Sequence, residues 1–277
     1  MSDFEPKEPR EKLSELATRV IEVASFASVV LLKYYRSTLD VSYKKDEFDP
    51  VTVADQESDA LIRDRLKELF PNDLILSEEN TEIPDSYDGR VWMVDPLDGT
   101  KDFVKGRDGF SINIGLLENG QIVFGCVVVP ARGQVFFAEK GKGAFEKTKG
   151  GCRRMHVSTV EDVMKARLVT RNPSGETRPI EEKIDPMPFK ERIPEGGIGT
   201  KLCLIASGNA EAHINTNFRA SKWDTLGPQL ILEEAGGMVT DFDGHTLDYK
   251  KPSVLWERSF VASNNSKIHS ELLKVTA

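Results

Sequence analysis

Residues 91–103 read VWMVDPLDGTKDF and combine a strand-like run with a crowd of acids. The four apolar residues at its start predict a buried strand. That strand ends in Asp95 and Asp98, with a proline between them that interrupts the ladder of strand hydrogen bonds. Gly99 permits a tight turn, and we expect Thr100 to cap a helix that begins directly after it. The stretch therefore predicts carboxylates that hold a hard cation beside helix amides that hold an anion.

The first half of the chain predicts two helices packed on an antiparallel sheet. Apolar residues recur with helical spacing over residues 11–36, and a second helix follows Asp55 until Pro71 stops it. Alternating residues around Asn119-Gly120 predict a β-hairpin. The expected strands are residues 74–76, 91–94, 110–116, 122–129, 134–139 and 143–147.

The second half alternates between strands and helices. We expect strands at residues 167–170, 211–214, 238–241 and 260–263, and helices at residues 201–207, 225–235 and 267–274. The boundary is placed in the Lys/Gly-rich stretch near residues 148–154, which gives domains 1–150 and 151–277. The fold class is α/β, with an α+β N-terminal half and an α/β C-terminal half.

Composition excludes several classes of function. The net charge is −8, with both signs interspersed, which argues against a surface that binds nucleic acid. The three cysteines form no CxxC pair, so a zinc site or disulfide framework is not expected and a reducing cytoplasm fits. The N-terminus has no signal-peptide core, and the apolar run at residues 29–32 is too short to span a membrane.

The acids at two strand ends predict a cation site. Glu78 and Glu79 follow the strand at residues 74–76, as Asp95 and Asp98 follow the next one. Oxygen ligands suit Mg²⁺, Mn²⁺ or Ca²⁺, and none of the four histidines has metal-motif spacing. One alternative is a turn capped by aspartate without any metal. An EF-hand is excluded, because that loop needs acids at alternate positions.

Distant segments extend the pattern. Asp55 in DPVTVAD (residues 49–55) and Asp224 in KWDTLGPQLILEEAGG (residues 222–237) each start a helix. Together with LILSEEN (residues 74–80) and WMVDPLDGTKDF, they resemble the lithium-sensitive, magnesium-dependent phosphomonoesterase family. That family includes inositol monophosphatases and 3'(2'),5'-bisphosphate nucleotidases. The resemblance runs from about residue 11 to residue 265.

The resemblance implies a layered α/β/α/β/α sandwich and a site between its halves that binds two to three Mg²⁺ ions. It assigns the first ion to Glu78, Asp95 and the carbonyl of Leu97, and the second to Asp95, Asp98 and Asp224. A third ion would lie near Glu78, largely through water. Asp55 and Thr100 would orient and deprotonate the attacking water, and the amides of Gly99 and Thr100 would hold the phosphate. Glu79 is either a supporting residue or solvent-facing. Asp102 is expected at the helix start, and Trp223 is expected as a packing anchor that fixes Asp224.

The substrate is less well determined by these patterns. Inositol monophosphatases of animals carry a glutamate seven residues before the aspartate of the WD pair, where this chain has Asn217. The segment GTKLCLIASG (residues 199–208) is similar to the G-S-x-K-x-C helix of the bisphosphate nucleotidases, and so is the K-W-D-T run. By that similarity, Lys201 and Thr200 would bind a second phosphate of the substrate. The alternative for Lys201 is a solvated side chain on a helix face.

Two further sets of residues are assigned to the substrate region. Arg171 and Asn172 border the base or the second phosphate, and Lys44 matches a loop lysine of the family near the metals. The resulting hypothesis is hydrolysis of 3'-phosphoadenosine 5'-phosphate to AMP and phosphate, which clears a by-product of sulfate activation. Inositol polyphosphate 1-phosphatase and inositol monophosphatase activities are the alternatives within the family. Lithium inhibition is expected from the resemblance alone.

Two alternatives come from other classes of function. The chain could be a non-catalytic relative that binds a nucleotide or a metal, against which the complete set of matched acids argues. It could be an RNA-processing nuclease, against which the acidic charge argues. The expected partner is a small phosphorylated molecule, with no nucleic acid and no membrane. We expect a cytoplasmic monomer or homodimer.

Overall fold

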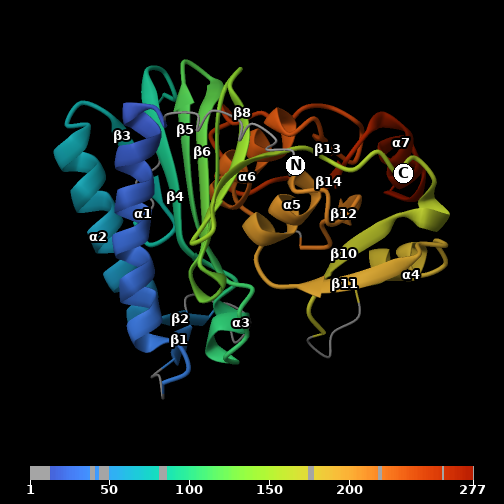
Figure 1. Cartoon of the computed structure of the whole chain (residues 1–277), viewed down its shortest axis with the longest axis horizontal. Coiled ribbons are helices and arrows are strands. Elements are labelled where there is room, and N and C mark those ends of the chain that lie inside the picture. The colour runs from blue at the N-terminus through green and yellow to red at the C-terminus, as the bar shows by residue number, and fades with distance from the viewer. Residues whose placement is uncertain are drawn as a thin grey trace, which may run out of the picture.

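The computed structural model describes residues 13–37, 41–43, 50–80, 86–173, 178–217, 220–257 and 259–276. Lys44, which the resemblance placed near the metals, lies outside these residues. Figure 1 shows two sheets with helices outside and between them. The layers run α1–α2, a seven-stranded sheet, α5–α6, a five-stranded sheet, and α4–α7, which confirms the expected α/β/α/β/α sandwich.

The seven-stranded sheet belongs to the first half of the chain and has its strands in sequence order. They are β3 (Leu74–Ser77), β4 (Arg90–Asp98), β5 (Ser111–Glu118), β6 (Gln121–Val129), β7 (Gln134–Glu139), β8 (Gly143–Thr148) and β9 (Gly151–Met155). All neighbours pair antiparallel except β3 and β4. Asn119 and Gly120 both have positive φ angles, which confirms the expected hairpin turn. The domain boundary at residue 150 stays a prediction, and β9 continues this sheet past it to Met155.

The five-stranded sheet belongs to the second half. Its order is β11 (Glu191–Glu195), β10 (Arg167–Arg171), β12 (Ala212–Ile214), β14 (Phe260–Ser263) and β13 (Met238–Asp241). The strands β11, β10 and β12 run parallel to one another, and β14 and β13 complete the sheet antiparallel. A separate antiparallel pair is formed by β1 (Val41–Tyr43) and β2 (Pro50–Thr52).

Helices cover both sheets. They are α1 (Glu15–Tyr34), α2 (Val53–Leu69), α3 (Thr100–Val104), α4 (Pro179–Ile184), α5 (Ile198–Ala206), α6 (Lys222–Glu234) and α7 (Ser266–Thr276), with short 3-10 turns at Pro130–Arg132 and Val163–Lys165. In the part of the chain that is described, no helix combines the length and apolar character needed to cross a bilayer. The sequence did not predict α4, β1, β2, β9 or β11, because none of them carries a clear apolar repeat.

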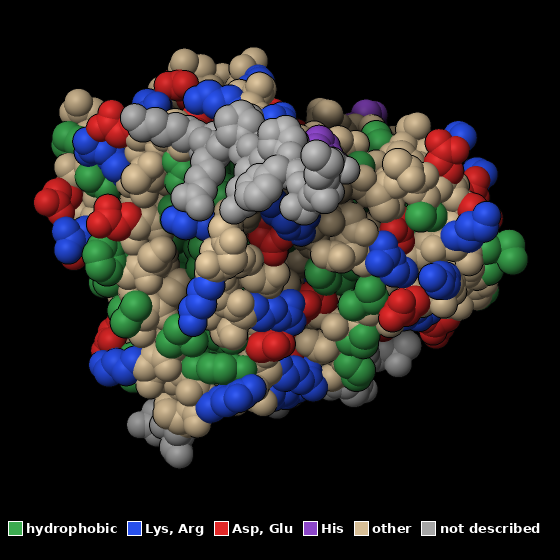
Figure 2. Space-filling model, in the orientation of Figure 1, with side chains coloured by type: hydrophobic (Ala, Val, Ile, Leu, Met, Phe, Trp, Pro, Cys, Tyr) green, Lys and Arg blue, Asp and Glu red, His purple; other side chains and the backbone are tan. Residues whose placement is uncertain are grey.

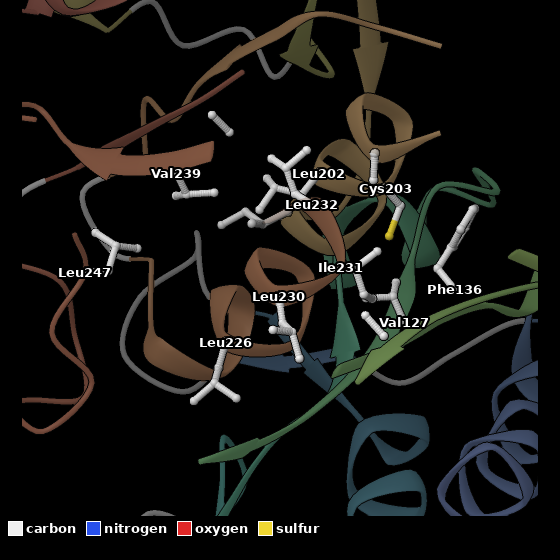
Figure 3. Packing of buried hydrophobic residues seen from close by; sticks show 14 of the residues in the cluster. Val127, Phe136, Leu202, Cys203, Leu226, Leu230, Ile231, Leu232, Val239 and Leu247 are labelled. Carbon is white, nitrogen blue, oxygen red and sulfur yellow. The ribbon is translucent and has the colours of Figure 1, made fainter. Parts of the chain in front are cut away.

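Three hydrophobic clusters hold the layers together. Trp92 and Val94 of β4 face α1 and α2, while Val91 and Met93 on the same strand face α5 and α6. Figure 3 shows side chains of α5 and α6 packed against Val127 of β6. The third cluster joins α4 and α7 to the outer face of the five-stranded sheet. A strand that is buried on both faces explains why residues 91–94 are continuously apolar.

Glycines let α6 lie unusually close to the first sheet. A Cβ atom added to Gly115 would come within 2.7 Å of the Gly227 amide, and one added to Gly125 within 2.3 Å of the Gly227 carbonyl. Distances this short leave no room for a side chain on either strand. The central helix is therefore fixed directly on β5 and β6, and its first turn reaches the end of β4.

Candidate active site

The end of β4 differs in detail from the expectation. The pairing with β5 is irregular between Asp95 and Asp98, but it resumes at Asp98, which pairs with Ser111. Pro96 therefore interrupts the ladder without ending the strand, which corrects the predicted end at residue 94. Asp95 is 1% exposed, and its Oδ1 accepts a hydrogen bond from the Leu97 amide at 2.9 Å.

Three carboxylates converge at this point. Oxygen atoms of Glu78, Asp95 and Asp224 all lie within 4.8 Å of one another. Glu78 follows β3, and its amide donates to the Val94 carbonyl at 3.1 Å, which holds the turn beside β4. Three segments that are remote in sequence thus deliver one acid each to a single place. The trio reproduces part of the ligand set that the resemblance implied.

The electrostatics of this trio favour a bound cation. Burial raises the pKa of Asp95 well above its usual range, and the charges of Glu78, Asp98 and Asp224 raise it further. Burial likewise raises the pKa of Asp224 well above its usual range, reinforced by Asp98 and Glu78. Crowded carboxylates with oxygen-only donors fit a hard divalent ion such as Mg²⁺, Mn²⁺ or Ca²⁺. Such an ion would be held by Glu78, Asp95 and Asp224.

Two of the acids occupy the same position on different helices. Asp55 is the third residue of α2, where its Oδ2 accepts the Thr52 amide at 2.7 Å and the Thr52 hydroxyl at 2.6 Å. Asp224 is the third residue of α6, and its Oδ2 accepts the Ser221 amide at 2.7 Å. Both are the acidic half of a capping box. The capping box orients each carboxylate, and its Ser/Thr-x-x-Asp spacing is a signal that our sequence analysis did not use.

Asp98 is held by contacts from both halves of the chain. Its Oδ2 accepts the Gly199 amide at 2.7 Å and Asn113 Nδ2 at 3.1 Å. Burial raises its pKa, although the Gly199 amide and the charge of Lys201 partly oppose that rise. Asp98 thus lies at the N-terminus of α5, where the helix dipole favours an anion. The structure places it next to the trio, and its role as a ligand of a second ion stays a prediction.

Thr100 does not cap α3, but it lies beside Asp55 as the resemblance implied. Gly99 is the N-cap of α3, and Thr100 is its first residue, so the prediction that Thr100 caps this helix is wrong. Its hydroxyl lies 3.2 Å from Asp55 Oδ1 and 3.0 Å from the carbonyl oxygen of Leu97. The structure therefore brings together Asp55, Thr100 and the Leu97 carbonyl, which the resemblance had placed in one site.

Gly99 is required by its surroundings. Its φ angle is +87°, and an added Cβ atom would approach the Gly197 amide nitrogen to 3.1 Å. Gly197 in turn would bring a Cβ atom to within 2.4 Å of Asp98 Oδ2. The Asp98–Gly99 turn and the start of α5 therefore touch backbone to backbone. This contact between the two halves of the chain was not predicted from the sequence.

The side chain of Lys201 is inside the protein. It is 6% exposed, so the alternative of a solvated lysine on a helix face is wrong. Burial lowers its pKa, while the charges of Asp98, Asp102 and Glu195 act in the opposite direction. Lys201 therefore introduces a positive charge beside the acids at the start of α5.

The other expected substrate residues have partners within the protein. The Thr200 hydroxyl is buried and donates to the Gly109 carbonyl at 3.2 Å, which ties α5 to the loop before β5. Arg171 Nε donates to Glu181 Oε1 at 2.7 Å, and Asn172 is half-buried directly after β10. Arg171, Asn172 and the start of α5 all follow the carboxyl ends of parallel strands, which is where α/β sheets bind ligands. Their contacts with a substrate stay predictions.

The remaining acids and Trp223 are accounted for by local contacts. Asp102 Oδ1 accepts a hydrogen bond from Arg107 Nη1 at 2.7 Å. Glu79 is half-buried in the turn after β3. Trp223 is 5% exposed and packs in the cluster around α5 and α6, as expected of an anchor. A second group joins His245 to Asp241 and Asp243, where Asp241 Oδ1 accepts the amides of both other residues. Those hydrogen bonds form a turn.

The buried network beside the acids contains residues that our sequence analysis missed. Glu195 is 5% exposed, and its Oε2 accepts a hydrogen bond from Arg132 Nη1 at 2.7 Å, while its Oε1 accepts the Gly196 amide at 2.8 Å. The pair joins the turn after β6 to the loop before α5. No motif marks Arg132 or Glu195, because their relation exists only in the folded chain.

Comparison with known proteins agrees with this geometry. Residues 12–277 match the model of the inositol monophosphatase family. The chain is 32% identical over 246 residues to the fructose-1,6-bisphosphatase/inositol-1-monophosphatase of Thermotoga maritima, with 88% of this chain and 90% of that protein covered. It is 31% identical over 235 residues to the 3'(2'),5'-bisphosphate nucleotidase CysQ of Salmonella typhimurium, with 83% and 92% covered.

Human inositol monophosphatase 1 is 29% identical over 264 residues, with 92% of this chain and 91% of that protein covered. Among solved structures, an inositol monophosphatase of Thermotoga maritima superposes with a TM-score of 0.81 at 28% identity, covering 95% of this chain and 97% of that one. The family match over nearly the whole chain and the convergent acids lead to one conclusion. The chain belongs to the inositol monophosphatase family and is a phosphatase of small phosphorylated molecules.

Proposed function

We propose that this phosphatase is a Mg²⁺-dependent 3'(2'),5'-bisphosphate nucleotidase that hydrolyses 3'-phosphoadenosine 5'-phosphate to AMP and phosphate. The observation that carries the proposal is the buried Lys201 at the start of α5. A buried cation next to an acidic site is costly unless anions surround it. Asp98 and Glu195 supply part of that compensation, and a second phosphate of the substrate would supply more.

The hydrolytic step is assigned to Asp55 and Thr100. Two to three Mg²⁺ ions held by Glu78, Asp95, Asp98, Asp224 and the Leu97 carbonyl would make a water molecule more acidic and neutralise charge on the phosphoryl oxygens. Thr100 would accept the proton of the attacking water as its own hydroxyl proton passes to Asp55 Oδ1, 3.2 Å away. The two hydrogen bonds from Thr52 keep the other oxygen of Asp55 in place during that transfer.

Binding of the transferred phosphate is assigned to the turn that follows Asp98. The amides of Gly99 and Thr100 would hold its oxygens, with Lys201, Thr200, Arg171 and Asn172 around the rest of the substrate. In-line attack on phosphorus depends mainly on positioning and on stabilisation of charge. The close contact between Gly99 and Gly197 supports this assignment, because it fixes the turn against α5.

Inositol phosphates are the alternative substrates. Proteins named as inositol monophosphatases are as similar to this chain as the nucleotidase is. Asn217, in place of the glutamate expected in animal inositol monophosphatases, favours the nucleotide. Inositol polyphosphate 1-phosphatase activity remains the second candidate, because its substrates also carry a second phosphate that Lys201 would bind.

The setting of the enzyme is also part of the proposal. The three cysteines, Cys126, Cys152 and Cys203, are far apart in the sequence and form no CxxC pair, which supports a reducing cytoplasm. Figure 2 shows acidic and basic side chains interspersed over the face that it displays, which supports a small-molecule substrate over nucleic acid. We propose a monomer or a homodimer.

The test is phosphate release in Mg²⁺ from 3'-phosphoadenosine 5'-phosphate, inositol 1,4-bisphosphate and inositol 1-phosphate, assayed side by side. The nucleotide should have the highest kcat/KM. Lys201→Met should raise KM for both bisphosphates by about 10–100-fold and leave inositol 1-phosphate nearly unchanged, because a charge-assisted contact is lost. Lys190→Met is the matched control, since Lys190 is exposed. A preference of the wild type for inositol 1-phosphate would refute the nucleotidase assignment.

A further inference from the structure

The side chain of Lys222, the first residue of α6, is fully buried, whereas a lysine on the surface of a helix would be exposed. Its relative exposure is 0%, and its Nζ atom donates to the Tyr249 carbonyl at 2.7 Å and also to the Lys251 carbonyl. The same Nζ atom lies 4.2 Å from the ring centroid of Tyr87. An ammonium group has three N–H donors. Two carbonyl oxygens and one aromatic face give each of these donors a partner.

The carbonyls that bind Lys222 belong to a loop that is attached to the start of α6 at several points. We call residues 249–256 the α6 loop. The Lys222 amide donates to the Val254 carbonyl at 2.9 Å, and the Trp256 amide donates to the Ala220 carbonyl at 3.0 Å. The hydroxyl of Tyr249 and Trp256 Nε1 both contact Thr225 Oγ1, at 3.0 and 3.1 Å. The α6 loop thus encloses the first turn of the helix.

A lysine in this place has a cost that a neutral side chain would avoid. The first turn of a helix carries the positive end of its dipole, so a cation there is unfavourable. The ammonium group is also removed from water, because the side chain is fully buried, and this adds to the cost. Two residues later, Asp224 projects from the same turn into the acidic trio, and its Oδ2 is tied to the Ser221 amide.

We propose that Lys222 is a positioning residue that fixes Asp224 relative to Glu78 and Asp95 and thereby sets the affinity of the site for its divalent cation. The inference rests on the proposed role of Asp224 as a metal ligand. Lys222 itself touches neither substrate nor metal. It anchors the turn to the α6 loop, and the backbone carries that constraint to Asp224. Residues that orient a ligand in this way typically change metal affinity by about 10–100-fold.

The test measures Mn²⁺ binding to the full-length protein by titration calorimetry, independently of turnover. Lys222→Met should weaken binding at the site that Asp224→Asn also weakens, by about 10-fold or more. Lys251→Met is the matched control from the same loop, because the Lys251 side chain is exposed and pairs with Glu257 at 3.3 Å. Lys251→Met should bind Mn²⁺ as the wild type does.

Two further variants separate positioning from simple loss of stability. Leu272→Ala empties part of the buried cluster under α7 and should lower the Tm without changing Mn²⁺ affinity. In an Asp224→Asn background, Lys222→Met should produce no additional loss of Mn²⁺ affinity, since its effect passes through Asp224. If Lys222→Met does not fold, Lys222→Gln retains an amide donor for one carbonyl and takes its place.

The outcomes distinguish the two levels of the proposal. Unchanged Mn²⁺ affinity in Lys222→Met, or a further loss in the Asp224→Asn background, would refute the positioning role. Unchanged affinity in Asp224→Asn alone would instead refute the assignment of Asp224 as a ligand, and with it the metal site of the proposed function.

Discussion

Asp95→Asn should make the protein more stable and inactive at the same time. Oxygen atoms of Asp95, Glu78 and Asp224 lie within 4.8 Å of one another. At that separation and an effective dielectric constant of about 20, each pair of ionised carboxylates repels by about 3.5 kcal/mol. Protonation of one of the three carboxylates limits the total repulsion energy. Asparagine keeps the size of the side chain and can still accept the Leu97 amide.

The expected gain can be expressed as a change in Tm. Without divalent cations, at pH 8, the variant should gain about 2–3 kcal/mol in free energy of unfolding, which corresponds to about 5–10 °C. Adding Mg²⁺ should raise the Tm of the wild type, because a ligand present at about 100 times its Kd stabilises by about 2.7 kcal/mol. The Tm of the Asp95→Asn variant should rise only slightly when Mg²⁺ is added. The variant should also lose most phosphatase activity, because it lacks the carboxylate that lies close to those of both Glu78 and Asp224.

The assay is thermal unfolding in EDTA and in Mg²⁺, followed by phosphate release on the same samples. Asp73→Asn is the control, since Asp73 is also buried but accepts Arg90 Nε and Trp92 Nε1, each at 2.9 Å. That variant should lose stability in both buffers. An Asp95→Asn protein that is less stable than the wild type in EDTA, or that keeps the full Mg²⁺ response, would refute the electrostatic reasoning.

Two further predictions concern Thr100 and His213. Thr100→Val should lower kcat by about 100-fold or more with little change in Mn²⁺ affinity, because it removes the hydroxyl between Asp55 and the Leu97 carbonyl. A kcat within a few-fold of the wild-type value would argue against this path for the proton. Burial lowers the pKa of His213 from 6.5 to about 3 in the folded protein. Between pH 6.5 and pH 3 the unfolded chain therefore binds one more proton than the folded protein, so the free energy of unfolding falls as the pH drops below about 6.5. Between pH 8 and pH 5 the free energy of unfolding should fall by about 2 kcal/mol more in the wild type than in His213→Asn, a variant that retains a donor for the Val169 carbonyl. The same pH dependence of unfolding in both proteins, measured by denaturation, would exclude this contribution.

Local patterns were enough to predict the segments that carry the site. The apolar run at residues 91–94 predicted a buried strand, which the structure confirms. Helices were expected to follow Asp55 and to cover residues 225–235, and the structure begins them slightly earlier, at Val53 and Lys222. The layered fold came from the resemblance to the family, and the family match confirms that resemblance. The acids at the two strand ends were predicted from the sequence itself, and their assignment to particular metal ions stays a prediction. Sequence spacing alone did not reveal that these acids meet, since Glu78 and Asp224 lie far apart in the chain.

What could not be predicted depends on contacts between distant segments. The Thr100 hydroxyl contacts Asp55 across the fold, and this pairing was expected from the resemblance alone, because local sequence patterns suggested only a helix cap. Lys201 was open to two interpretations, because a lysine on a short helix is usually solvated. Only the packing of α5 against the sheet shows that this side chain is buried.

Four acids of the site share one structural feature. A backbone amide binds one oxygen in each of Asp55, Asp95, Asp98 and Asp224, at 2.7–2.9 Å. Like charges that crowd together would otherwise rotate apart in the absence of a cation, and the amide both fixes the side chain and contributes partial positive charge. Because one oxygen is held, the orientation of the other follows from the backbone. The affinity for a cation is therefore set by the helix starts and strand ends that supply those amides, which is why Lys222, which anchors the first turn of α6, is expected to influence it.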